Sequence, residues 1–187
     1  RMAVKIVRVL NTNAVVSSDQ EGRELIITGA GIGFKKKKGE NLDEALADKT
    51  YYLESVDDSR RLQEVVKEIS EEYLEIVSRI VKTAREEGLK VRDSLYVTLT
   101  DHINSAVDRY RENIALKNMM KLEIRKFYPK EYEIGLRAVQ WIQEQNDENL
   151  GEDEAAFIAM HIVSAELGSG SNVDVNKITK LINAVLQ

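Results

Sequence analysis

Residues 4–17 have the sequence VKIVRVLNTNAVVS, and this stretch predicts a β-hairpin. Its two runs are rich in β-branched residues, and the Asn-Thr-Asn between them is typical of a tight turn. Similar patterns follow, so that the predicted strands cover residues 4–10, 14–17, 23–28 and 50–53. We therefore expect about residues 2–55 to form a small antiparallel β-sheet domain.

A single sheet of this size buries little apolar surface and is only marginally stable by itself. Pairing two copies would cover its apolar face. The sequence therefore favours a dimer of this domain.

After about residue 57 the pattern changes to the 3.6-residue periodicity of α-helices. The predicted helices cover residues 59–68, 70–87, 94–112, 117–127, 130–145, 152–167 and 174–186. Gly88 and Gly168 end two of them, and Pro129 lies at the start of another. Because the connections are short, we expect an α+β protein of two domains, with an all-α helical bundle after the sheet. The charge-rich segment 54–61 is the predicted linker.

Composition excludes several classes of protein. The 187 residues include no cysteine, which excludes disulfide scaffolds, thiol catalysis and cysteine-bound zinc. The absence of a long apolar run or a signal-peptide pattern predicts a cytoplasmic protein without membrane insertion. Although the net charge is −5, residues 1–39 carry eight basic and three acidic residues. This asymmetry suggests a polyanionic partner for the basic end.

Residues 29–38, GAGIGFKKKK, follow the third predicted strand. They lack the third glycine of a dinucleotide fingerprint and the Gly-Lys-Ser/Thr of a P-loop, so a nucleotide cofactor is not expected. Glycine permits tight turns, and one interpretation is a plain turn with a solvated lysine run. The other is a nucleic-acid-binding loop, in which Phe34 stacks on an unpaired base and the lysines contact phosphates.

The chain has two histidines. His102 lies at the edge of the apolar stripe of its predicted helix, and is either a half-buried structural residue or a titratable, modifiable imidazole. His161 lies in a helix that is apolar nearly all round, where a satisfied core histidine is the simplest interpretation. Neither belongs to a metal-binding or nucleophile motif, so we expect no enzyme, no catalytic residue and no metal or other cofactor.

Several segments together resemble one family, the BglG/SacY bacterial transcriptional antiterminators. They are KIVRVLNTN at 5–13, EGREL at 21–25, GIGFKKK at 31–37, LTDHI at 99–103, FYPKEY at 127–132 and DEAAFIAMHIVSA at 153–165. The resemblance implies a co-antiterminator (CAT) RNA-binding domain at 2–55 and a first phosphotransferase-system (PTS) regulation domain, PRD1, at 62–168. It also implies that residues 169–187 are a linker and helix leading to a second such domain, which this chain lacks.

In that family the front domain forms a dimeric barrel that binds a leader mRNA hairpin and prevents formation of the terminator. The resemblance places the RNA-binding positions at Arg8, Asn13, Gly29, Ala30, Gly31 and Phe34. It makes His102 and His161 the phosphorylation sites, acted on by PTS phosphocarrier and sugar-permease components. Family members usually carry a basic residue where this chain has Ala30, which removes a potential RNA contact.

The sequence thus predicts an RNA-binding antiterminator regulated by histidine phosphorylation. The alternative from another class is a helical sensor or protein-interaction module whose β domain only dimerises. Binding to a hairpin would separate the two.

Overall fold

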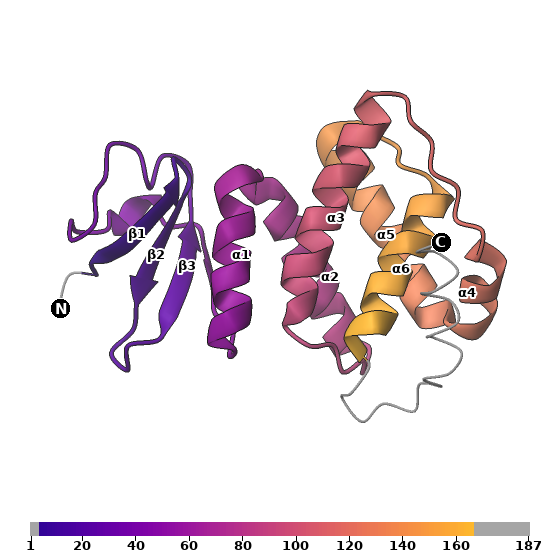
Figure 1. The fold of residues 1–187 in the computed structure, drawn as a ribbon, viewed down its shortest axis with the longest axis horizontal. Helices are drawn as coiled ribbons and strands as arrows, with labels where there is room; N and C mark the ends of the chain where they lie inside the picture. Colours follow the sequence, from indigo (N-terminus) through magenta and orange to yellow (C-terminus); the bar gives the residue numbers. More distant parts are fainter. Residues whose placement is uncertain (1–3, 167–187) are drawn as a thin grey trace. The chain divides into compact units, whose positions relative to one another are not determined.

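The structure is a computed structural model, and it describes residues 4–166 of the chain. The chain divides into two compact units, with the boundary between Leu74 and Glu75. Figure 1 shows the sheet and helices along the sequence. An antiparallel sheet followed by helices is the predicted α+β class.

The first unit contains a four-stranded sheet whose spatial order is the order of the sequence. Its strands are β1 (Ile6–Asn11), β2 (Ala14–Ser18), β3 (Glu24–Thr28) and β4 (Lys49–Tyr51), and a short 3-10 helix, η1 (Glu44–Leu46), precedes the last. All neighbours are antiparallel, with Arg8 opposite Val16, Val16 opposite Ile26, and Ile26 opposite Tyr51. The four predicted strands are confirmed. They form an open sheet within one chain, and the dimeric barrel stays a prediction.

Both faces of this sheet are covered within the unit. One face carries an apolar cluster of Ile6, Val15, Ile27, Ile32 and Leu42. Adjacent strand residues point to opposite faces, so the neighbours Val16 and Ile26 lie on the other one. There helix α1 (Val56–Glu68) packs against β1 and β3, burying Leu62 and Val66. Because α1 covers this face, no second copy is needed to bury it, and the dimer stays a prediction.

Helix α1 also corrects the predicted linker. It begins at Val56, and the Ser55 side chain caps it by accepting a hydrogen bond of 3.2 Å from the Asp58 backbone N–H. Segment 54–61 therefore contains the first turns of a helix. The acidic residues Asp57 and Asp58 stabilise this first turn through the helix dipole.

The second unit is a bundle of helices. Helix α2 (Glu71–Glu86) begins in the first unit, and the bundle continues with α3 (Ser94–Arg111), α4 (Lys121–Phe127), α5 (Pro129–Asn146) and α6 (Glu152–Glu166). Helix α6 contacts α3, α4 and α5, as its all-round apolar surface predicts. Gly135 lets α5 approach α6 closely, because a β-carbon there would overlap the Ala155 carbonyl oxygen. The predicted helices within residues 4–166 are confirmed, although α4 begins at Lys121 and not at residue 117.

The predicted stretch 169–187, with its helix at 174–186, lies outside the described residues. Within residues 4–166, no helix is long and apolar enough to cross a membrane.

Candidate functional site

The glycine-rich loop after β3 is a series of tight turns. Backbone N–H groups of Ile32, Phe34 and Lys36 donate to carbonyls three residues earlier, at 3.0–3.2 Å. Two glycines are required by packing, since a β-carbon at Gly29 would overlap the Leu46 carbonyl oxygen and one at Gly33 that of Asn11. Gly31 has a φ of +76° and open space where a side chain would be. A bare stretch of backbone is therefore accessible at Gly31.

Asn13 holds this loop in place. The Asn13 side-chain oxygen, Oδ1, accepts a hydrogen bond of 2.9 Å from the Gly31 N–H. The Asn13 backbone carbonyl oxygen accepts one of 3.0 Å from the Gly29 N–H. Its amide nitrogen donates to Glu71 Oε1 at 3.1 Å. The structure thus brings Asn13, Gly29 and Gly31 together, and the first turn of α2 occupies the donor of Asn13.

Arg8 is held by other partners. Its guanidinium donates to Gln63 Oε1 of α1 at 2.5 Å and to Glu24 Oε2 of β3 at 3.1 Å. Burial by itself would raise the pKa of Glu24, but hydrogen bonds from Gln63 and Arg8 and the charges of Arg8 and Arg60 together outweigh it and lower the pKa. Sequence reasoning missed Glu24, Gln63 and Glu71, because nothing in a local pattern indicates which helix packs on a strand.

Phe34 and Ala30 are exposed on the same loop. The Phe34 side chain is 59% exposed. The Lys35 ammonium lies 5.4 Å from the ring centroid, and Lys36 to Lys38 follow. An accessible aromatic face beside several positive charges is the arrangement that stacks on bases and attracts phosphates.

The second place of interest is a pair of histidines in the bundle. His102 of α3 and His161 of α6 have ring centroids 4.6 Å apart, with the ring planes inclined by 47°. Both are half-buried, and the His102 side chain is 15% exposed. Two histidines that are distant in the sequence therefore form one site.

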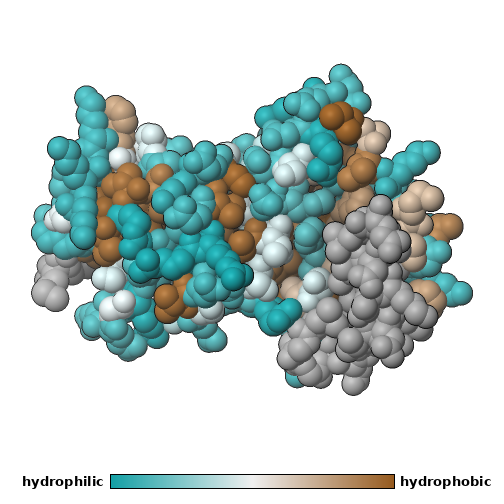
Figure 2. Space-filling view, viewed as in Figure 1, coloured by the Kyte–Doolittle hydropathy of each residue, from teal (hydrophilic) through white to brown (hydrophobic). Residues whose placement is uncertain are grey.

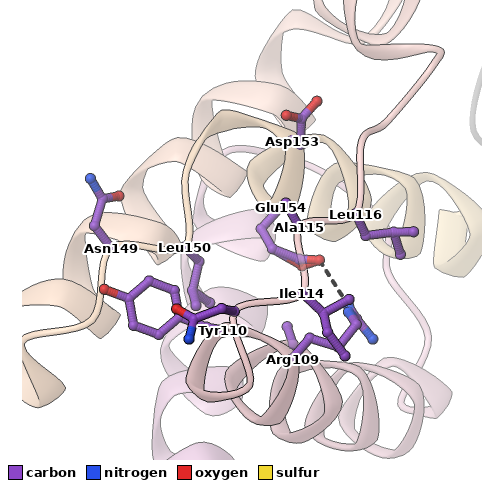
Figure 3. A pocket seen from close by; sticks show the side chains of 11 residues that line it. Arg109, Tyr110, Ile114, Ala115, Leu116, Asn149, Leu150, Asp153 and Glu154 are labelled. Carbon is purple, nitrogen blue, oxygen red and sulfur yellow. Dashed lines mark hydrogen bonds and ion pairs between the residues drawn. The ribbon is translucent and has the colours of Figure 1, made fainter.

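Glu154 and Arg109 complete this histidine site. His102 Nε2 lies 3.2 Å from Glu154 Oε2, and Arg109 donates to the other oxygen, Oε1, at 3.2 Å. Each new residue lies two helical turns from a histidine on its own helix and therefore on the same face. That spacing was the signal that sequence reasoning did not use. Figure 3 shows Arg109 and Glu154 joined beside an open pocket of about 360 Å³.

The environment keeps His161 neutral. Burial, followed by the proximity of His102, lowers the pKa of His161 to about 3. A neutral imidazole has a nitrogen lone pair that can accept a phosphoryl group. The Glu154 carboxylate favours a proton on His102 Nε2, much as a buried carboxylate orients the histidine of a catalytic triad. No cluster of potential metal ligands occurs among residues 4–166.

Comparison with known proteins gives matches to both units. The CAT RNA binding domain model matches residues 4–60, and the PRD domain model matches residues 63–165. The chain is 36% identical to the beta-glucoside operon antiterminator of Dickeya chrysanthemi over 98% of its length, covering 65% of that protein. It is also 36% identical to transcription antiterminator LicT of Bacillus subtilis, covering 98% of this chain and 66% of LicT. The chain thus spans just under two thirds of these relatives.

A solved structure agrees with these matches. The crystal structure of GlcT CAT-PRDI is 27% identical, with a TM-score of 0.71 over 89% of this chain and all of that one. Sheet, bundle and matched models together define a chain in which a CAT RNA-binding domain precedes a PRD domain. The chain belongs to the BglG/SacY family of transcriptional antiterminators, as the resemblance predicted. Both of these relatives are named as antiterminators.

Proposed function

We propose that this chain binds a hairpin in leader mRNA and thereby prevents formation of a transcription terminator, under the control of histidine phosphorylation. The observation that carries the RNA-binding proposal is the Gly29–Lys38 loop, where Phe34 is exposed beside the lysines. Hairpins with internal loops offer unstacked bases, and proteins read RNA sequence mainly at such bases. Matches to the CAT family and to named antiterminators support the same conclusion.

Each candidate residue has a physical role in this proposal. Phe34 stacks on an unpaired base, and the lysines contact phosphates. Gly31 offers open backbone to the RNA chain, and Gly29 and Asn13 hold the loop in shape. Ala30 provides no long side chain, so this chain makes fewer contacts there than a basic residue would.

Arg8 and Asn13 must exchange partners to contact RNA directly. Both are bonded to residues of α1, α2 or β3, of which Glu24 and Glu71 are acidic. These carboxylates would repel an approaching phosphate. Binding through Arg8 or Asn13 therefore requires that the start of α2 or the end of the Arg8 side chain moves.

The regulatory part of the proposal rests on His102 and His161. Their half-buried rings and the low pKa of His161 support a role as phosphoryl acceptors. The donors would be PTS phosphocarrier and sugar-permease components, since the second unit matches the PRD family. We place this function in the bacterial cytoplasm, where nascent mRNA and these donors meet.

We also propose that the chain acts as a homodimer. In the second unit, large apolar side chains are exposed between α3 and the end of α4, namely Ile114, Leu116, Met119, Leu122 and Phe127. At the right edge of Figure 2, on the side where Figure 1 places α4, apolar residues are visible among hydrophilic ones. Exposed apolar groups gathered in one segment favour a protein interface. Sedimentation of the chain and of a Met119→Lys/Leu122→Lys variant tests this: a wild type that stays monomeric at the RNA-binding concentration would contradict it.

The decisive experiment is selection of RNA ligands from a library of hairpins, followed by gel-shift measurement of the selected hairpin. A scrambled hairpin of equal length is the control. We expect a clear preference that weakens as salt is raised. Equal binding of both hairpins would instead favour the alternative, a sensor or interaction module whose β domain only dimerises.

A further inference from the structure

The two histidines are close enough to behave as one site. Their ring centroids are 4.6 Å apart, and His102 is linked through Glu154 to Arg109. We propose that His102 and His161 form a single acceptor that holds one phosphoryl group at a time, with Arg109 as its charge partner. This inference rests on the proposed phosphorylation and states its stoichiometry and its positioning residues.

Charge limits the site to one phosphoryl group. A phosphorylated side chain carries a charge of about −1.5 to −2 at neutral pH. At a ring separation of 4.6 Å, two such groups would be neighbours at a half-buried site, where salt and water screen charge poorly. The Glu154 carboxylate adds a further negative charge in contact with His102. Transfer of a second phosphoryl group is therefore strongly disfavoured once the first is present.

Arg109 can compensate for one phosphoryl group. Its side chain is 27% exposed and ion-paired with Glu154, whose side chain is 10% exposed. A guanidinium presents several donors in a planar fork, which matches phosphate oxygens as well as carboxylate oxygens. A phosphoryl group on either imidazole would thus compete with Glu154 for Arg109. Breaking the Arg109–Glu154 pair removes an ion pair between α3 and α6, which carry these residues.

The transfer itself is balanced. A neutral imidazole nitrogen of the pair attacks the phosphorus of a phosphohistidine on the donor protein. The new N–P bond forms as the donor's N–P bond breaks, and the donor imidazole recovers its lone pair. The phosphorylated ring gains positive charge on its N–H, and for His102 the Glu154 carboxylate is in position to stabilise it.

The test phosphorylates the full chain with an excess of donor proteins and measures intact mass at neutral pH. The variants His102→Ala and His161→Ala are treated in parallel. We expect the wild type to reach a plateau of one phosphoryl group per chain, and each variant to accept one as well. In the wild type, peptide mapping should find the phosphoryl group on His102 in some chains and on His161 in others, while the intact mass shows no chain with two groups.

The outcomes separate the two proposals. Two phosphoryl groups on one wild-type chain would overturn the single-site inference and leave the proposed regulation intact. Failure of one single-histidine variant to accept a group would also overturn the shared site. A wild type that accepts none, while the donors phosphorylate a known acceptor, would remove the proposed phosphorylation itself.

Arg109→Gln tests the charge partner, and Arg111→Gln is the matched control on the same helix, because Arg111 pairs with Glu148 instead. We expect Arg109→Gln to lower the phosphorylation rate or the phosphohistidine lifetime at least about tenfold, as loss of a charge-assisted hydrogen bond predicts. Arg109→Lys keeps the charge, and its phosphorylation rate or phosphohistidine lifetime should lie between those of the wild type and Arg109→Gln. This second variant also tests the role of Arg109 if Arg109→Gln does not fold. Equal behaviour of the Arg109 and Arg111 variants would refute the role of Arg109.

Discussion

Replacing Phe34 by alanine tests the RNA-binding surface most directly. The Phe34 side chain is 59% exposed, so the domain loses little packing when it is removed. We expect the free energy of unfolding to change by no more than about 0.5 kcal/mol, as for most surface substitutions. A ring that stacks on a base contributes about 1–3 kcal/mol to binding, so affinity for the selected hairpin should fall by roughly 5- to 150-fold. If a dimer places two such rings on one hairpin, the loss in free energy doubles.

The assay is RNA affinity measured over a range of salt concentrations. Phe34 carries no charge, so Phe34→Ala should weaken binding without changing the slope of log affinity against log salt. By contrast, Lys37→Ala should reduce that slope by roughly 0.7–0.9 if Lys37 neutralises one phosphate. Tyr52→Ala is the matched control, because Tyr52 is also an exposed aromatic beside a cation, Arg23, but lies outside the glycine-rich loop.

The reasoning fails if Phe34→Ala binds the hairpin as tightly as the wild type. It also fails if Tyr52→Ala causes an equal loss, since the effect would then not be specific to the loop. In either case Phe34 would be a surface residue without a role in RNA binding.

Three further predictions concern the surroundings of the two candidate sites. Glu71→Gln should raise RNA affinity severalfold, because it removes the carboxylate that accepts a hydrogen bond from the Asn13 amide. The control is Glu72→Gln, which removes the same charge from the neighbouring residue. An equal gain in affinity for both variants would show that the effect comes from net charge and not from the contact with Asn13. Gly135→Ala should lower the free energy of unfolding by about 1–3 kcal/mol in denaturant titrations, because the added β-carbon would overlap the Ala155 carbonyl oxygen. The control is Glu133→Ala on the same helix, which should change the free energy of unfolding very little because Glu133 is exposed. Burial and a hydrogen bond with Glu131 raise the pKa of Glu166 from 4.5 to about 8. Between these two values the folded state binds more protons than the unfolded state. The free energy of unfolding should therefore fall as pH rises from 4.5 to 8, by less than about 1.4 kcal/mol per pH unit. The lowered pKa of His161 makes the free energy of unfolding rise with pH between about 3 and 6.5, so the effect of Glu166 is best measured from pH 6.5 to 8. In that range Glu166→Gln should flatten the decrease in the free energy of unfolding. An unchanged slope would contradict the assignment of the decrease to Glu166.

The boundary of α1 illustrates a local signal that was present but outweighed. Ser55 followed by Asp58 has the spacing of a helix cap, and the structure uses it in that way. The density of charge in 54–61 suggested a solvated linker instead. Charge alone does not distinguish an exposed loop from the exposed face of an amphipathic helix, because both lie in water.

The covering of the sheet could not be predicted from local pattern. The alternation of β2 and β3 indicates that each strand has apolar residues on both faces, but not which element packs there. In the structure α1 covers the Val16–Ile26 face and brings Gln63 to Arg8. The strand pattern alone leaves an apolar face that a second copy would have to cover, whereas in the structure the first helix covers it.

The sequence by itself determined the strands, the helices and the loop chemistry, because side-chain periodicity, capping and the conformational freedom of glycine act over a few residues. It also carried the family resemblance, and with it the identity of His102 and His161. Only the tertiary structure decided that these two rings are neighbours and that Glu154 links His102 to Arg109. It also decided that the Asn13 amide donates a hydrogen bond to Glu71. Such pairs are set by the packing of whole elements, which depends on the summed burial of many side chains and not on any local pattern.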